Sequence, residues 1–299
     1  MTSLRLGIIG MSDGNGHPYS WSAIFNGYNA AAMAECPLPV IPAYLARQTF
    51  PQDAIPHTHV THIWTQDKTI SRHIAKAALI DTVVDKYESM VGQVDAVLLA
   101  RDDAENHLTM SAPFLKAGLP VYIDKPLAYS TAEAERIYDL QRYEGQIFTC
   151  SALGFAAELR VTQAQLSTLG ALRRVEARIS NSWEKYAVHV IEPALNAIGD
   201  QGDIVETERN DAGGVRQVKV TWASGLQTTF STHGPAVMTP EIVLVGDAGR
   251  LSLQFKDTFA AFKSALQTFV DIIRGSADPI PRSSVMKVVR IIEIGCADE

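Results

Sequence analysis

The sequence has little cysteine, and this bears on where the protein works. Its 299 residues include three cysteines, Cys36, Cys150 and Cys296, with no CxxC pair among them. That number and spacing favour a reducing compartment over a disulfide-stabilised secreted fold. The apolar run that ends at Gly10 is too short for the core of a signal peptide. We therefore expect a cytoplasmic protein.

Long apolar runs and an excess of positive charge are also missing. No apolar run reaches the ~18 residues that indicate a membrane-spanning helix. The 33 acidic residues outnumber the 26 basic ones and give a net charge of −7. Nucleic acids and anionic membranes bind proteins through clustered Lys and Arg, so neither is expected as a partner. The hydrophobic share of 46% is ordinary for a soluble globular protein, and the length suits one or two domains.

The first half of the chain alternates between strand and helix patterns. Strands are expected at 4–9, 60–64, 82–84, 95–100, 120–123 and 146–150. Helices are expected at 20–28, 71–78, 87–91, 104–117 and 130–143. The proline-rich stretch 37–59 is interpreted mainly as an inserted loop. Such alternation predicts an α/β fold with a doubly wound parallel sheet of the Rossmann type.

The pattern changes after about residue 150. Strands are expected at 175–179, 215–222, 226–231, 241–245 and 250–253, followed by a helix at 259–273. Apolar and polar residues alternate along 218–222, as in an antiparallel sheet with one wet face. We expect a dinucleotide-binding domain over 1–150. Residues 151–299 should form an α+β domain with a predominantly antiparallel open sheet, which binds substrate and mediates oligomerisation.

Three motifs carry a family resemblance. The first is Leu6-Gly-Ile-Ile-Gly10 at the end of the first strand. The second runs from the strand at 95–100 through His107 and Ala117-Gly118 to Val121-Tyr-Ile-Asp-Lys-Pro126. The third is Tyr186-Ala-Val-His-Val-Ile-Glu192. Together they resemble the Gfo/Idh/MocA oxidoreductases, related to glucose-fructose oxidoreductase and inositol dehydrogenase, whose second motif ends in Glu-Lys-Pro.

The resemblance implies NAD or NADP as cofactor. It suggests that the dinucleotide lies across Gly10, Ser12 and Gly14, with Asp67 at the adenosine ribose. Because a strict GxGxxG is absent, a glycine-rich turn that binds nothing is the alternative, and Asp67 could simply cap the following helix. The other expected cofactor-side residues lie at the ends of the next two strands and in the helix between them: Asp102, His107, Asp124 and Pro126. Asp102 stands where the family more often has a small residue or proline, and a charged helix entry is its alternative role.

Lys125 and His189 are the main candidate catalytic residues. In the family the lysine faces nicotinamide and the substrate hydroxyl, where an ammonium stabilises developing alkoxide charge. An imidazole near neutrality suits the proton transfer that accompanies alcohol oxidation, although a structural histidine is the alternative. Lys185 stands where the family has an acidic residue, so it would disfavour the imidazolium or bind an anionic substrate group. Tyr186 could donate the proton if His189 does not.

These motifs favour NAD(P)-dependent chemistry at a secondary alcohol or carbonyl of a sugar or sugar derivative. A non-redox enzyme that uses tightly bound NAD transiently, and a degenerate protein that only binds dinucleotide or sugar, are the alternatives. Family members commonly associate through the second sheet, so a homo-oligomer is expected. No metal is expected, because His57, His59 and His62 would not share one face of a strand.

Overall fold

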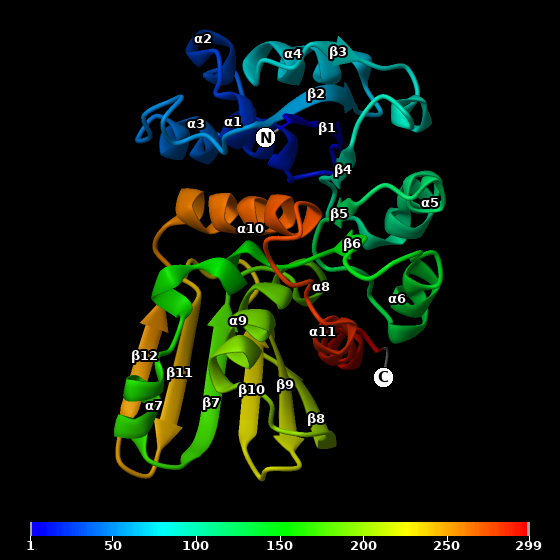
Figure 1. Ribbon diagram of the computed structural model, residues 1–299. Coiled ribbons are helices and arrows are strands. Elements are labelled where there is room, and N and C mark those ends of the chain that lie inside the picture. The colour runs from blue at the N-terminus through cyan, green and yellow to red at the C-terminus, as the bar shows by residue number, and fades with distance from the viewer. Residues whose placement is uncertain (1, 298–299) are drawn as a thin grey trace. The chain divides into compact units, whose positions relative to one another are not determined.

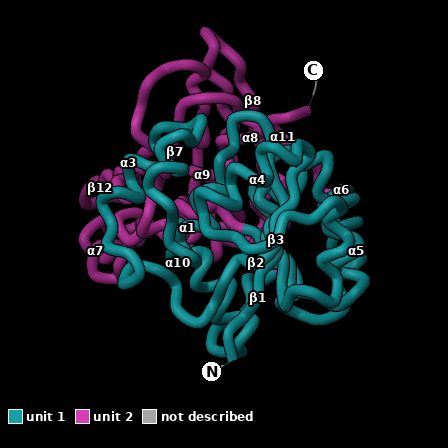
Figure 2. The backbone as a smooth tube through the Cα atoms, turned by 90° about the horizontal axis from the view of Figure 1, so that it is seen from above, with its two compact units in different colours: residues 1–128, 132–149, 262–281 teal, residues 129–131, 150–261, 282–299 magenta. Residues whose placement is uncertain are grey.

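The computed structural model describes residues 2–297. The chain divides into two compact units (Figure 2). Unit 1 comprises residues 1–128, 132–149 and 262–281, and unit 2 comprises residues 129–131, 150–261 and 282–299. Each unit has its own six-stranded sheet (Figure 1).

The sheet of unit 1 is parallel throughout. Its strands are β1 (Leu4–Ile9), β2 (Thr58–Trp64), β3 (Thr82–Val83), β4 (Ala96–Leu99), β5 (Val121–Ile123) and β6 (Ile147–Phe148), in the order β3-β2-β1-β4-β5-β6. The strand order reverses between β1 and β4, which is the point where open α/β sheets bind ligands beyond the carboxyl ends of their strands. The predicted Rossmann-type fold is confirmed.

The helices of this part of the chain mostly follow the predicted pattern. They are α1 (His17–Asn26), α2 (Ala30–Met33), α3 (Val40–Leu45), α4 (Lys68–Ala77), α5 (His107–Ala117) and α6 (Thr131–Tyr138), with 3₁₀ turns η1 (Tyr87–Met90) and η2 (Ala104–Asn106). Helix α1 begins three residues before Ser20, because Pro18 suits a first turn. Helix α3 lies in the stretch interpreted as loop, since its prolines fall at the N-cap and in the first turn.

Helix α10 (Thr258–Ile273) returns late in the sequence to complete the core of unit 1. The ring of Phe269 lies 5.6 Å from those of Tyr122 and Phe148. At the start of the same segment, the ring of Phe262 lies 6.4 Å from that of Trp21. These rings are apolar partners of strands β5 and β6 and of helix α1, so the first 149 residues do not form this core by themselves.

The sheet of unit 2 is mixed and mostly antiparallel. Its strands are β7 (Leu172–Ile179), β8 (Ile204–Ala212), β9 (Val215–Trp222), β10 (Gln227–Thr232), β11 (Glu241–Gly246) and β12 (Arg250–Gln254). They follow the order β12-β11-β7-β10-β9-β8, and only β10 and β7 pair in parallel. The helical elements are α7 (Gln163–Leu169), α8 (Trp183–Tyr186), α9 (Val188–Ile198) and α11 (Arg282–Cys296), with η3 (Ala152–Phe155) and η4 (Ala157–Leu159).

Strand β8 and helix α11 were not predicted. Most side chains of β8 are exposed and several are charged, so its sequence lacks the alternation that marks a half-buried strand. The alternation in β9 is confirmed, since Val218, Val220 and Trp222 are buried.

Helix α9 packs on β7 and α11 packs on β9. Among the described residues, no helix combines the length and apolar character needed to cross a membrane.

Candidate active site

The loop between β1 and α1 is shaped by its glycines. A Cβ on Gly10 would lie 2.2 Å from Cγ of Pro18, so only glycine allows this approach of strand to helix. Gly14 has a φ of +73°, which also favours glycine. A Cβ on Gly16 would come within 2.5 Å of side chains in and just before helix α3. The loop is therefore a tight turn at the position where Rossmann folds bind pyrophosphate.

The amide groups at the start of α1 already have partners. The N–H of His17 donates to Oδ1 of Asn15 at 2.8 Å, and the N–H of Tyr19 donates to the carbonyl of Gly16 at 3.0 Å. Pro18, which lies between them, has no N–H. In dinucleotide folds these first-turn amides usually face phosphate. A pyrophosphate at this helix start must displace the Asn15 side chain or bind the loop backbone before it.

Gln66 fixes the beginning of the same loop. Its side chain accepts a hydrogen bond from the N–H of Met11 at 3.1 Å and donates to the Met11 carbonyl at 2.6 Å. Arg101 donates two further hydrogen bonds, one to the Met11 carbonyl at 3.2 Å and one to Oε1 of Gln66 at 3.1 Å. The ends of β2 and β4 thus hold the loop backbone in place, and the polar edge fits a polar ligand such as a dinucleotide.

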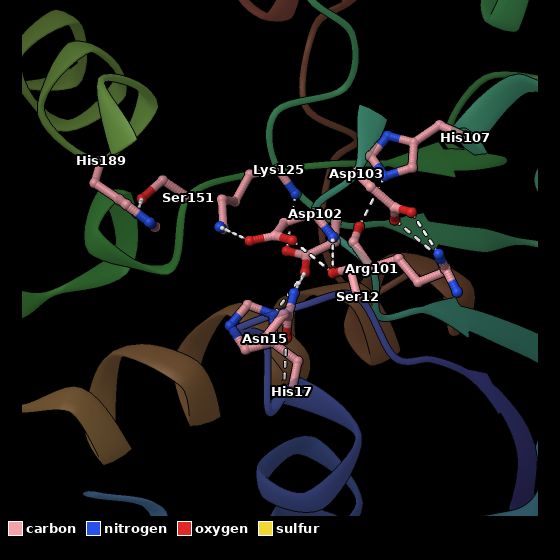
Figure 3. Close-up of polar contacts among 11 residues, drawn as sticks. Ser12, Asn15, His17, Arg101, Asp102, Asp103, His107, Lys125, Ser151 and His189 are labelled. Carbon is pink, nitrogen blue, oxygen red and sulfur yellow. Dashed lines mark hydrogen bonds and ion pairs between the residues drawn. The ribbon is translucent and has the colours of Figure 1, made fainter. Parts of the chain in front are cut away.

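Lys125 follows β5 and is buried together with Asp102 and Ser12 (Figure 3). Its Nζ lies 3.6 Å from Oδ2 of Asp102, and Oδ1 of Asp102 accepts a hydrogen bond of 2.6 Å from the Ser12 hydroxyl. The Asp102 N–H returns a bond to Ser12 Oγ at 3.1 Å. The ammonium of Lys125 is therefore a buried charge held by a carboxylate, and not a solvated side chain at a strand end.

Asp124, which precedes Lys125, is fully buried and accepts three hydrogen bonds. Oδ2 accepts from Nδ2 of Asn15 at 2.9 Å and lies 2.6 Å from Nδ1 of His17 (Figure 3). Oδ1 accepts the N–H of Lys125 at 2.8 Å. Burial alone would raise the pKa of Asp124, but His17 and then Lys125 outweigh it and hold that pKa far below its usual range. The carboxylate is therefore ionised.

The other residues predicted on the cofactor side have structural partners. Oδ1 of Asp67 accepts the N–H groups of Thr69 and Ile70, at 2.7 and 3.4 Å, and so caps α4. His107 is fully buried, and its two ring nitrogens lie 2.9 and 2.7 Å from the carbonyls of Leu127 and Arg101. His107 thus ties together the segments that follow β4 and β5. A cofactor contact of Asp67 or His107 stays a prediction.

His189 begins the second group of candidate residues, which lies in unit 2. Its Nδ1 lies 2.8 Å from Oγ of Ser151, whose N–H donates to Oε2 of Glu192 at 2.7 Å. Burial raises the pKa of Glu192 to about 8. The Tyr186 ring meets the His189 ring edge-on at 5.9 Å. Lys185 lies on the same short helix, α8, as Tyr186.

Several residues of these clusters were not predicted as site residues: Asn15, His17, Gln66, Arg101, Ser151 and Glu192. His17 had one available signal, a histidine directly after the glycine loop. Its partner Asp124 lies 107 positions away in the sequence, so the pair depends on the tertiary fold.

Among residues 2–297, no cluster of three or more His, Cys, Asp or Glu is arranged to hold a metal ion.

Comparison with known proteins finds a family model that matches part of the chain. Residues 41–151 match the model of an oxidoreductase family with an NAD-binding Rossmann fold, GFO_IDH_MocA. No curated protein matches the sequence.

Solved structures share the fold at low sequence identity. Myo-inositol 2-dehydrogenase from Lactobacillus plantarum is 15% identical, with a TM-score of 0.71 over 98% of this chain and 96% of that one. Biliverdin reductase from Synechocystis sp. PCC 6803, solved with biliverdin and NADP+, is 11% identical, with a TM-score of 0.69 over 97% of both chains. GenD2 from gentamicin A biosynthesis, solved with NAD, is 13% identical, with a TM-score of 0.72 over 98% and 93%. Residues 41–151 thus match the family that the motifs predicted, and its description as an NAD-binding oxidoreductase agrees with the enzyme class and cofactor that the motifs indicated. The solved structures share the fold over nearly the whole chain.

Proposed function

We propose that this protein oxidises or reduces a secondary alcohol or carbonyl of a sugar or sugar derivative. The observation that carries the proposal is the buried Lys125 ammonium beside Asp102 at the carboxyl edge of the parallel sheet. When bound, the dinucleotide supplies the hydride acceptor or donor. The name of the similar myo-inositol 2-dehydrogenase supports a polyhydroxylated substrate.

Lys125 is proposed to bind and orient the reacting oxygen. Its charge favours an alkoxide over the hydroxyl, and this lowers the barrier to hydride loss from the same carbon. Asp102 restricts where the ammonium can lie and offsets part of its charge. The family motif makes His189 one candidate for the proton-exchanging group, and Nδ1 of its ring lies 2.8 Å from Oγ of Ser151.

NAD is the proposed preferred cofactor. The Asp67 carboxylate ends the β2–α4 connection, where Rossmann folds contact the adenosine ribose, and it would repel the extra phosphate of NADP.

A cytoplasmic location and self-association through the sheet of unit 2 are also proposed. Among residues 2–297 none of the three cysteines forms a disulfide bond, which supports a reducing compartment.

Titration with NADH and with NADPH, followed by nucleotide fluorescence, tests this function. Wild-type protein should bind at least one of the two, and Lys125→Ala should bind it with similar affinity while losing turnover in a screen of sugars and polyols. Steady accumulation of NADH separates a dehydrogenase from a non-redox enzyme that regenerates its NAD. Folded protein that binds neither nucleotide, oxidised or reduced, would refute the proposal.

A further inference from the structure

Unit 1 contains a histidine–carboxylate pair whose carboxylate lies in the second family motif and whose histidine lies outside the motifs. His17 opens α1, and its Nδ1 lies 2.6 Å from Oδ2 of Asp124 at the end of β5. The carboxylate side chain is 1% exposed, so water does not compete for this bond. His17 has a carboxylate partner, and Nδ1 of His189 lies 2.8 Å from the Ser151 hydroxyl.

The environment of the pair determines which ring nitrogen carries the proton. Asp124 is ionised and can only accept, so Nδ1 of His17 must be the donor. In the neutral imidazole, the opposite nitrogen, Nε2, then holds a lone pair and acts as a base. The ring cannot easily turn, because it stacks on Trp21 at 4.7 Å and meets the edge of Phe262 at 5.0 Å.

Nε2 of His17 is open to a ligand. Within residues 2–297, no protein group forms a hydrogen bond with this nitrogen. The side chain is 16% exposed. The same carboxylate that orients the ring also accepts the backbone N–H of Lys125, so the His17 ring and the Lys125 backbone are held by one group at the ligand-binding edge.

We propose that His17 and Asp124 form an acid–base pair that exchanges the proton of the substrate hydroxyl oriented by Lys125. In oxidation, the O–H bond breaks and its proton moves to Nε2 of His17. The nicotinamide, when bound, would accept the hydride of the carbon that bears the hydroxyl and leave a carbonyl, and reduction would reverse both transfers. This inference rests on the proposed function, and it assigns to His17 the proton exchange that the sequence motif assigns to His189.

The charges around the pair suit this role. The Asp124 carboxylate stabilises the imidazolium that forms when Nε2 takes a proton, as an orienting carboxylate does in other acid–base pairs. Lys125 opposes that charge from β5, and Asp102, which reaches Lys125 from β4, offsets it. On the side of α10 the ring meets Phe262, which is uncharged.

Nitrogen-15 NMR of histidine-labelled protein gives a readout that needs no turnover. In the pH range where the His17 ring is neutral, the inference requires its proton on Nδ1, and Asp124→Asn should abolish this preference. A neutral ring with its proton on Nε2 would overturn the inference while leaving the proposed function intact.

Kinetics decide the role in the reaction, with NAD and the sugar or polyol that the wild-type enzyme turns over. His17→Gln should lower kcat by ~100-fold or more, the usual contribution of a general base. It should also remove the ionisation of the base from the pH–rate profile and leave the Kd for NADH within about threefold. His59→Gln is the matched control, because it makes the same substitution at an exposed histidine of unit 1 that lies in strand β2.

The variants separate this inference from its alternatives. If His17→Gln keeps kcat and the pH profile while His189→Gln loses both, the proton passes through His189 and the inference is wrong. If His17→Gln lowers kcat but leaves the ionisation in the pH–rate profile, the pair is only structural and the inference is wrong. Wild-type protein that turns over no sugar or polyol refutes the proposed function, and this inference with it.

Discussion

Replacing Asp124 by asparagine tests the central electrostatic feature of unit 1. The two side chains have the same shape, but the carboxylate oxygens accept from Asn15 and His17 on one side and from the N–H of Lys125 on the other. Whichever way the new amide is turned, its NH₂ group faces at least one donor. The variant therefore leaves a buried donor unpaired and removes the negative charge beside His17 and Lys125.

The expected loss of stability is large. Removing one partner of a buried, hydrogen-bonded charge pair typically costs about 3–5 kcal/mol, and the retained shape of asparagine places our expectation near the lower end. Urea unfolding followed by circular dichroism measures this difference. Asp85→Asn is the control, since it removes the carboxylate of the exposed ion pair with Lys68 and should have no measurable effect.

The dependence on pH follows from the direction of the pKa shift. The pKa of Asp124 lies lower in the folded than in the unfolded chain, so the stabilisation is complete above the unfolded value of ~3.9. It is lost as the pH falls through the folded pKa. The stability difference between wild type and Asp124→Asn should therefore shrink as the pH falls below about 3.9 and vanish in stronger acid. A stability loss below about 1 kcal/mol at pH 7 would refute the reasoning about this cluster.

Three further outcomes are expected. Because burial raises the pKa of Glu192 to about 8, wild-type stability should fall as the pH rises from about 4.5 to 8, and Glu192→Gln should remove that slope in urea unfolding; an unchanged slope would contradict the assignment. Gly10→Ala should destabilise the fold by about 1–3 kcal/mol, because its Cβ would overlap Pro18, and a melting temperature equal to that of wild type would show that the turn can adapt. Asp67→Asn keeps a good helix cap but removes the charge, so fluorescence titration should show tighter NADPH binding with the helix content unchanged; an unaltered ratio of NADH to NADPH affinity would place Asp67 away from the ribose.

The sequence predicted the elements that repeat a local pattern. The strands of the parallel sheet and the position of Lys125 after a buried strand follow from apolar runs, turn residues and the Lys-Pro motif. Strand β8 was missed because its mostly exposed side chains carry no period-two signal. Helix α3 was missed because prolines that suit a first turn resemble prolines that prevent a helix.

The polar partners within the site could not be predicted from local pattern. Asp102 reaches Ser12 across 90 positions, and Asp124 reaches Asn15 across 109. Such pairs depend on the parallel sheet bringing the ends of β1, β4 and β5 to one edge. Sequence spacing therefore indicated which strand ends carry candidate site residues, and the fold determined which of their side chains are in contact.

The late return of α10 to unit 1 has a consequence for how the chain can be made and divided. Because Phe262 and Phe269 complete the core around Trp21, Tyr122 and Phe148, the nucleotide-binding half cannot finish folding until residue 281 has left the ribosome. Most of unit 2 is synthesised in the interval. A fragment cut at residue 149 would display those aromatic rings to water and should aggregate, so neither half can be exchanged as a continuous piece of sequence.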